Sequence, residues 1–202
     1  MIRNYSKNFY FLFVPFICGL ISTLSLPPYN FFYLNFISFP FLLLFYLSLE
    51  IKKSFSSFLY GWIFGFTYFV SNIYWITNSL TVEEIFKPLI PLAITIIPLF
   101  LGSFYGVSFL IFSYLKPKKK IGSIFLFALI FSFIEYLRGH IFGGFPWNLI
   151  SFSLVEVNQF LQILSYIGTY SFNLIVVTIF LVPSVIFFEV TTKAKILTVL
   201  MA

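Results

Sequence analysis

The chain has 202 residues, of which 60% are hydrophobic and only 9% are charged, and its formal net charge is +6. A soluble domain usually carries about 25% charged residues, so this chain has too few polar side chains to cover a surface in water. The composition excludes an ordinary soluble domain and predicts an integral membrane protein that crosses the bilayer several times.

The apolar runs, bounded by Pro, Gly and charged residues, divide the chain into six predicted spans and the start of a seventh. The six spans are residues 9–26, 34–49, 55–80, 88–115, 121–137 and 161–188. The seventh covers residues 194–202, and a helix of that length reaches only about 14 Å, half of a bilayer. The predicted fold is an all-α transmembrane helix bundle, with residues 1–202 as one membrane domain.

The basic residues alternate with the predicted spans. Lysines or arginines precede span one and follow spans two, four and six, whereas the other loops are neutral or acidic. Because Lys and Arg mark cytoplasmic loops, this pattern predicts a cytoplasmic N-terminus. The same pattern accounts for the positive net charge, since the basic residues form no continuous face, and we expect no nucleic-acid partner.

Few side chains in this sequence could act as a nucleophile, a catalytic acid or base, or a metal ligand. Cys18 lies inside the first span without a charged neighbour, and the only histidine, His140, is predicted near the opposite membrane surface as a headgroup-level aromatic. The chain has no Asp, so neither a hydrolytic triad nor a metal site can be assembled. We therefore expect no catalytic residue, no metal and no cofactor. The 32 phenylalanines are interpreted as lipid-facing substitutes for Leu.

Two ionisable residues stand out near the outer end of the fifth span. Glu135 and Arg138 are three residues apart, which places them on one face of a helix. Charged groups at membrane depth are costly unless they are paired or face a polar cavity. A structural ion pair that ends the helix and a role facing the substrate both fit this pattern.

The stretch that follows, "GHIFGGFPWN" at 139–148, opposes a continuous helix because of its glycines and its proline. It predicts an irregular turn at the membrane interface, with Phe145 and Trp147 as headgroup-level anchors. A lipid-headgroup site and a plain interfacial loop both remain open. Candidate residues for a lipid groove are Glu135, Arg138, Gly144, Phe145, Pro146, Trp147 and Asn148.

Two other motifs are interpreted structurally. Gly61 and Gly65, four residues apart in the third span, are typical of close helix packing. Asn72 and Trp75 give the outer half of this span a polar and aromatic character, and "SLPPYNFF" at 25–32 predicts a rigid turn.

Four segments together resemble the membrane domain of apolipoprotein N-acyltransferases. They are "LSLPPYNFFYLNFISFPFLL" at 24–43, "YGWIFGFTYFVSNIYWI" at 60–76, "FIEYLRGHIFGGFPWNLISFS" at 133–153 and "LQILSYIGTYSFNLIVV" at 161–177. The third is similar to the family's signature, in which a Glu-x-x-Arg-Gly helix end leads to Gly-Phe-Pro-Trp-Asn. The resemblance covers essentially the whole chain.

The resemblance implies an enzyme of the bacterial inner membrane that matures lipoproteins. A periplasmic nitrilase-like domain, inserted after the seventh helix, would carry a Glu-Lys-Cys catalytic set. Its cysteine would take an acyl chain from a phospholipid as a thioester and pass it to the N-terminal diacylglyceryl-cysteine of a lipoprotein. None of these three residues can be placed here, and Cys18 matches no part of the motif.

We therefore expect a chain that is inactive alone: a fragment, a frameshift product, or half of a split enzyme with a separate catalytic half. The alternative reading is a non-catalytic lipid-binding or scaffolding membrane protein built on the same bundle. Finding a catalytic Glu, Lys and Cys, in the same chain or in a neighbouring gene, would distinguish the two.

Overall fold

The computed structural model describes residues 2–51, 53–115, 117, 119–188 and 198–199. The α-helices in this part of the chain are α1 (Ile2–Thr23), α2 (Asn35–Ser48), α3 (Ser54–Asn72), α4 (Thr77–Leu80), α5 (Ile90–Leu115), α6 (Lys120–Arg138), α7 (Asn158–Ile167) and α8 (Thr169–Leu181). The 3-10 helices are η1 (Phe32–Leu34), η2 (Tyr74–Ile76), η3 (Glu84–Leu89), η4 (Ile150–Leu154) and η5 (Val182–Phe187). These residues contain no strand, and the predicted all-α fold is confirmed.

Three helical stretches among the described residues are long and apolar enough to cross a membrane. They are Glu84–Leu115, Lys120–Arg138 and Thr169–Phe187. The helices over Asn8–Thr23 and Phe32–Ser48 are also apolar but shorter. This pattern supports the predicted membrane bundle.

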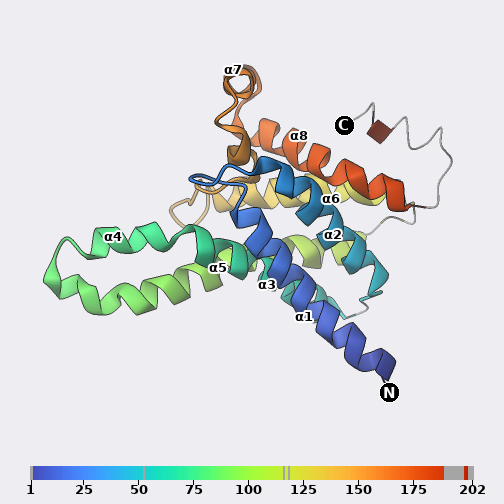
Figure 1. Ribbon diagram of the computed structural model, residues 1–202, viewed down its shortest axis with the longest axis horizontal. Helices are drawn as coiled ribbons and strands as arrows, with labels where there is room; N and C mark the ends of the chain where they lie inside the picture. Colours follow the sequence, from blue (N-terminus) through green and yellow to red (C-terminus); the bar gives the residue numbers. More distant parts are fainter. Residues whose placement is uncertain (1, 52, 116, 118, 189–197, 200–202) are drawn as a thin grey trace.

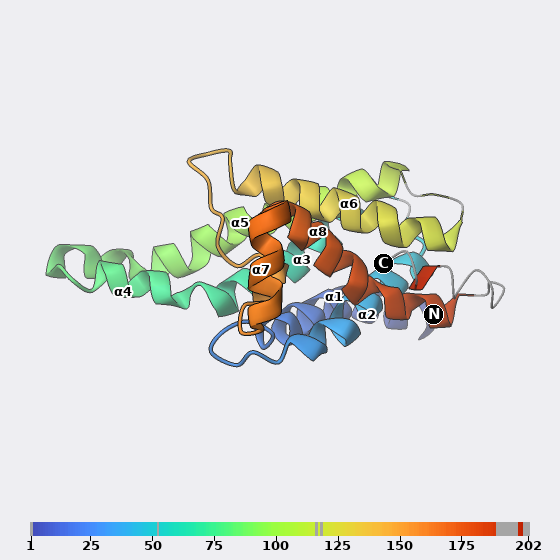
Figure 2. The same cartoon turned by 90° about the horizontal axis from the view of Figure 1, so that it is seen from above.

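The long helices run side by side, and the segments that connect them lie at the two ends of the bundle (Figure 1). One end, here called the basic end, holds the α2–α3 and α5–α6 connections with Lys53 and Lys119. The other, here called the loop end, holds the turn after α1, residues 73–89 and residues 139–157. From the loop end, η2, α4, η3 and the start of α5 extend past the other helices as a projecting hairpin (Figures 1 and 2).

The closest helix pair, α3 with α5, meets through glycines. A Cβ atom on Gly65 would lie 2.9 Å from the Cα atom of Gly102, and one on Gly61 would lie 2.5 Å from the main-chain oxygen of Tyr105. Real Cβ atoms do not come so close, so only glycine permits this approach. The predicted packing role of Gly61 and Gly65 is confirmed, and the contact follows the small-residue rule for membrane helices.

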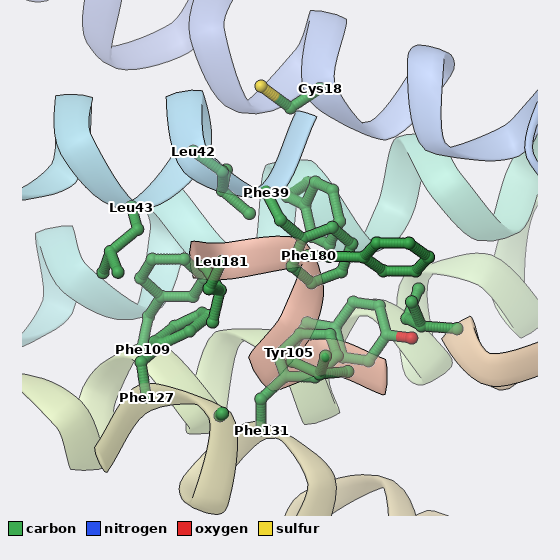
Figure 3. Close-up of a cluster of buried hydrophobic side chains, with 14 of the residues drawn as sticks. Cys18, Phe39, Leu42, Leu43, Tyr105, Phe109, Phe127, Phe131, Phe180 and Leu181 are labelled. Atoms are coloured by element: carbon green, nitrogen blue, oxygen red, sulfur yellow. The ribbon is translucent and has the colours of Figure 1, made fainter. Parts of the chain in front are cut away.

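The centre of the bundle is aromatic, so the interpretation of the phenylalanines as lipid-facing does not hold for those in the core, although others, such as Phe9, Phe41 and Phe133, are exposed. Figure 3 shows phenylalanines from several helices together in the core. Fully buried examples are Phe39, Phe64, Phe109, Phe127 and Phe131. Their rings meet largely edge to face, as for Phe39 and Phe131, whose centroids lie 5.7 Å apart at 84°. Such geometry suits the charge distribution of aromatic rings.

Two predicted spans differ from the structure. The third is α-helical only to Asn72 and continues through η2 into the short α4. The sixth, predicted as one helix over 161–188, is wrong as a single span because it breaks at Gly168, whose φ of +78° does not belong to a right-handed helix. Figure 2 shows α7 crossing the direction of α8. The predicted seventh helix, residues 194–202, falls almost wholly outside the described residues.

Candidate functional site

At the loop end of α6, Glu135 and Arg138 form an ion pair that is shut off from the surface. Their side chains are 0% exposed, and Nη2 of Arg138 lies 3.6 Å from Oε1 of Glu135. A buried charge is stable only when it is paired and hydrogen-bonded. The hydrogen bonds that the two side chains make to other groups therefore show which parts of the structure the pair holds in place.

Glu135 ties together three helices. Its Oε1 atom accepts a hydrogen bond of 2.8 Å from Oη of Tyr105 on α5, and its Oε2 atom accepts one of 2.5 Å from Nδ2 of Asn173 on α8. The Oδ1 atom of Asn173 in turn accepts a 3.0 Å bond from the main-chain N–H of Ser151 in η4. The carboxylate thus fixes η4 through one intermediate side chain.

Arg138 holds the loop that follows α6. Its Nη1 atom donates to the main-chain oxygens of Phe145, at 2.6 Å, and of Trp147, at 2.9 Å. The N–H of Phe145 returns a 2.9 Å bond to the main-chain oxygen of Arg138. The guanidinium carbon also stands 5.1 Å from the centroid of the Phe69 ring, a distance suited to cation–π attraction.

The loop needs backbone shapes that favour glycine and asparagine. Residues with φ in the left-handed region are Phe142, Gly143, Gly144 and Asn148. At Gly144 a Cβ atom would also lie 2.5 Å from the main-chain oxygen of Gly139, so both shape and space require glycine there. Oη of Tyr68 on α3 donates a 3.0 Å bond to the main-chain oxygen of Asn148, which fixes the end of the loop.

Held in this way, the Trp147 side chain is 57% exposed and borders a groove of about 390 Å³. The groove is lined by Leu26, Pro27, Asn72, Trp75, Trp147, Asn148, Phe152 and Val155. The two tryptophan rings meet edge to face, with centroids 6.5 Å apart at 83°. The lining is mostly apolar, with two carboxamides among the aliphatic and aromatic groups.

The turn after α1 contributes Leu26 and Pro27 to the lining of the groove. Nδ2 of Asn35 donates a 2.9 Å bond to Oγ of Ser25 inside this turn. Nδ2 of Asn30 donates a 2.9 Å bond to Oε1 of Glu156, which follows η4. The turn is therefore hydrogen-bonded both to α2 and to the segment that follows η4.

The predicted site residues divide into two groups. Trp147 and Asn148 line the groove, and Pro146 is exposed beside them. The buried Glu135 and Arg138 and the half-buried Gly144 and Phe145 lie behind it. Reasoning from the sequence did not assign six of the lining residues to a site, namely Leu26, Pro27, Asn72, Trp75, Phe152 and Val155. Nor did it assign Tyr68, Tyr105 and Asn173 to the support of the site. Polar residues inside apolar spans were the available signal for Tyr105 and Asn173.

Cys18 and His140 stand apart from the groove. Cys18 is buried in the core. His140 is exposed at the loop end, where its Nδ1 atom lies 2.7 Å from the main-chain oxygen of Tyr136 and its ring contacts those of Tyr136 and Tyr170. Within the described ranges, no three His, Cys, Asp or Glu side chains gather closely enough to hold a metal ion.

The comparisons with known proteins agree on one family. Residues 18–182 match the family model described as the apolipoprotein N-acyltransferase N-terminal domain. Proteins named apolipoprotein N-acyltransferase from Sinorhizobium medicae and Brucella melitensis are 35% and 34% identical to the chain over 182 and 180 residues. The matches cover 86% and 85% of this chain but 34% of each relative, so the chain spans about a third of their length. The chain belongs to the apolipoprotein N-acyltransferase family, and the part of the family that it matches is the N-terminal domain.

Proposed function

We propose that this chain is the membrane domain of an apolipoprotein N-acyltransferase and that its groove receives an acyl chain of the phospholipid donor. One observation carries the proposal. The groove is built where three of the segments that resemble the family meet: Leu26 and Pro27 come from the first, Asn72 and Trp75 from the second, and 147–152 from the third. Segments far apart in the sequence thus meet at one surface.

The lining suits a lipid that is apolar along its chain and polar at its ester. Leu26, Phe152 and Val155 offer aliphatic and aromatic contact, whereas the amides of Asn72 and Asn148 offer hydrogen-bonding groups beside them. Ligand sites commonly have a volume of about 300–1,000 Å³ and combine an apolar wall with a few polar groups. The groove has both properties.

Glu135 and Arg138 act in this proposal as positioning residues. They are buried behind the groove, and they hold the main chain of 145–147 so that Trp147 faces outward. The groove lining includes no nucleophile. The acyl transfer itself would use the Glu, Lys and Cys that the family resemblance implies, supplied by the remaining two thirds of the length of the relatives or by a separate catalytic half.

The lysines support an orientation in the bacterial inner membrane. Lys53 and Lys119 lie at the basic end, which would face the cytoplasm together with the N-terminus. The groove would then open toward the periplasmic side, where the N-terminus of a lipoprotein would meet it.

The test replaces Trp147 with Ala in the chain expressed with its catalytic portion, in cis or from a separate gene. Acylation of lipoprotein N-termini is measured in cells, with Phe142→Ala as the control because Phe142 is exposed in the same loop but does not line the groove. We expect Trp147→Ala to lose most acyl transfer at a normal protein level, and the control to keep it. Unchanged transfer in Trp147→Ala would sink the proposal, and a search that finds no catalytic portion would favour the scaffold reading.

A further inference from the structure

The short helix α7 is amphipathic and carries no charge. Its sequence, "NQFLQILSYI", places Phe160, Ile163, Leu164 and Ile167 at the spacing i, i+3, i+4, i+7 along one face. Gln159, Gln162, Ser165 and Tyr166 lie toward the opposite face, and Leu161 is the one apolar residue of α7 outside the apolar face. Such a helix needs an apolar environment on one side only.

The bundle covers only part of this apolar face. Phe160 and Leu164 pack against the core, and the ring of Phe160 lies 5.9 Å from that of Phe172 on α8. Ile163 and Ile167 remain 41% and 38% exposed. The uncovered side chains must meet another apolar medium or partner.

The position of α7 identifies that medium. The stretch that begins directly after Gly168, Thr169–Phe187, is a candidate span of 19 residues, and at 1.5 Å per residue it covers about 28 Å, close to the whole hydrocarbon thickness. The bilayer therefore ends near Gly168. Figure 1 looks almost along the axis of α7 beside the first turn of α8, and Figure 2 shows α7 crossing that direction.

The spanning helices next to α7 also carry exposed apolar side chains. Ile175 and Ile179 on α8 and Phe133 on α6 are exposed, and on helices long enough to cross the bilayer such side chains face lipid. Aromatic residues that favour the headgroup layer are exposed near this junction. They are Tyr166 on α7 and Tyr136 at the end of α6, and the ring centroid of Tyr136 lies 5.2 Å from that of Tyr170 in the first turn of α8.

We infer that α7 is an interfacial helix that lies flat in the headgroup layer at the loop end, with Ile163 and Ile167 in the lipid and Gln159 and Gln162 in water. The partner is the lipid surface itself. Because α7 has no charged residue, the helix is held by buried apolar area and not by attraction to anionic lipid. This inference is independent of the proposed function.

The test uses single spin labels on the full chain in lipid bilayers. Cys18→Ala removes the only cysteine, and cysteines are then introduced singly at Gln159, Gln162, Ile163 and Ile167. Collision with oxygen, which enters lipid, is compared with collision with a water-soluble nickel complex. Ile179 serves as the lipid reference and Lys119 as the water reference, since both are exposed.

We expect labels at 163 and 167 to favour oxygen like the label at 179, and labels at 159 and 162 to favour nickel like the label at 119. The preference should change sign between 162 and 163, equally in neutral and in anionic bilayers. Nickel preference at 163 and 167 would overturn the inference, as would protection of both positions from both reagents, which would mean that protein covers α7. If a label at Gln159 or Gln162 lowers the midpoint of thermal unfolding, a label at Ser165 or Tyr166 on the same polar side replaces it. On the lipid side, either of the labels at 163 and 167 is sufficient for the comparison.

Discussion

Arg138 and Trp147 are joined by a hydrogen bond of 2.9 Å from the guanidinium of the first to the main-chain oxygen of the second. A charge that is shut off from the surface thus fixes a tryptophan that stands at the edge of the groove. The sequence from Glu135 to Asn148 thus corresponds in space to a buried ion pair and the loop whose main chain Arg138 holds.

Replacing Arg138 with Ala should lower the free energy of unfolding by about 3–5 kcal/mol, because it leaves the Glu135 carboxylate buried without its cation. Arg138→Lys should also be strongly destabilising, since a single ammonium nitrogen would have to replace both Nη1, which donates to two carbonyl oxygens, and Nη2, which lies 3.6 Å from Glu135. Thermal unfolding in detergent measures both, with the exposed Lys119→Ala as the control.

The pair itself can be tested by combining Arg138→Ala with Glu135→Gln. The double variant should be more stable than the sum of the two single changes predicts, because no charge is left unpaired. Additive effects would show that the two side chains act separately.

Tyr68→Phe removes one hydroxyl from the support of the groove. Its loss leaves the main-chain oxygen of Asn148 without this donor, so we expect a cost of about 1–3 kcal/mol and faster amide hydrogen exchange over 143–148. The matched control is Tyr114→Phe, because Tyr114 is 72% exposed and should tolerate the change. Equal exchange in both variants would rule out Tyr68 as a support of the loop.

Gly65→Ala should separate α3 from α5. The new methyl group would lie 2.9 Å from the Cα atom of Gly102, and overpacking of this kind costs about 1–3 kcal/mol. At Gly122, in the first turn of α6, the nearest atom would be 3.4 Å away, so Gly122→Ala should be neutral or stabilising by up to about 1 kcal/mol. The midpoint of thermal unfolding should therefore fall for Gly65→Ala and stay unchanged or rise for Gly122→Ala. Equal midpoints for the two variants would contradict the close approach of α3 and α5.

Gly168→Ala tests the junction between α7 and α8. The backbone there has φ +78° and ψ 158°, a region open almost only to glycine, and a side chain in it costs about 1–3 kcal/mol. Since nothing lies within 4 Å of the new Cβ atom, any loss comes from the backbone alone. Ser165→Ala, in the exposed part of α7, is the control, and an unchanged midpoint for Gly168→Ala would contradict the strained geometry.

Much of the fold could be predicted from the lengths of the apolar runs and from the Pro, Gly and charged residues that bound them. The helices over 35–48 and 120–138 match their predicted spans closely, because a membrane helix must satisfy its backbone internally over a continuous apolar run. The break at Gly168 was missed since the run from Leu161 to Phe188 stays apolar across it. Hydropathy indicates whether a segment prefers an apolar environment, but it does not indicate the φ angle of a single residue.

The candidate site was only partly predictable. Local spacing placed Glu135 and Arg138 on one face of a helix. Their other partners lie far along the chain, with Tyr105 at a separation of 30 residues and Asn173 at 38, and no local pattern joins them. The groove likewise depends on the turn at Pro27, which meets 147–155 only in the folded bundle. The orientation in the membrane and the role of the groove remain predictions.

The projecting hairpin is too long to lie wholly within the hydrocarbon layer. The stretch Glu84–Leu115 has 32 residues and is at least about 48 Å long at 1.5 Å per residue, whereas the hydrocarbon layer is about 30 Å thick. Even a tilt of about 40°, the upper end for membrane helices, leaves part of it outside. The contact of Gly65 with Gly102 fixes α5 against α3, and α5 runs from Ile90 into the bundle as one helix, so the tip is carried on a helix that is anchored in the core. A domain seated against that tip would be kept at a constant height above the lipid, without a flexible tether.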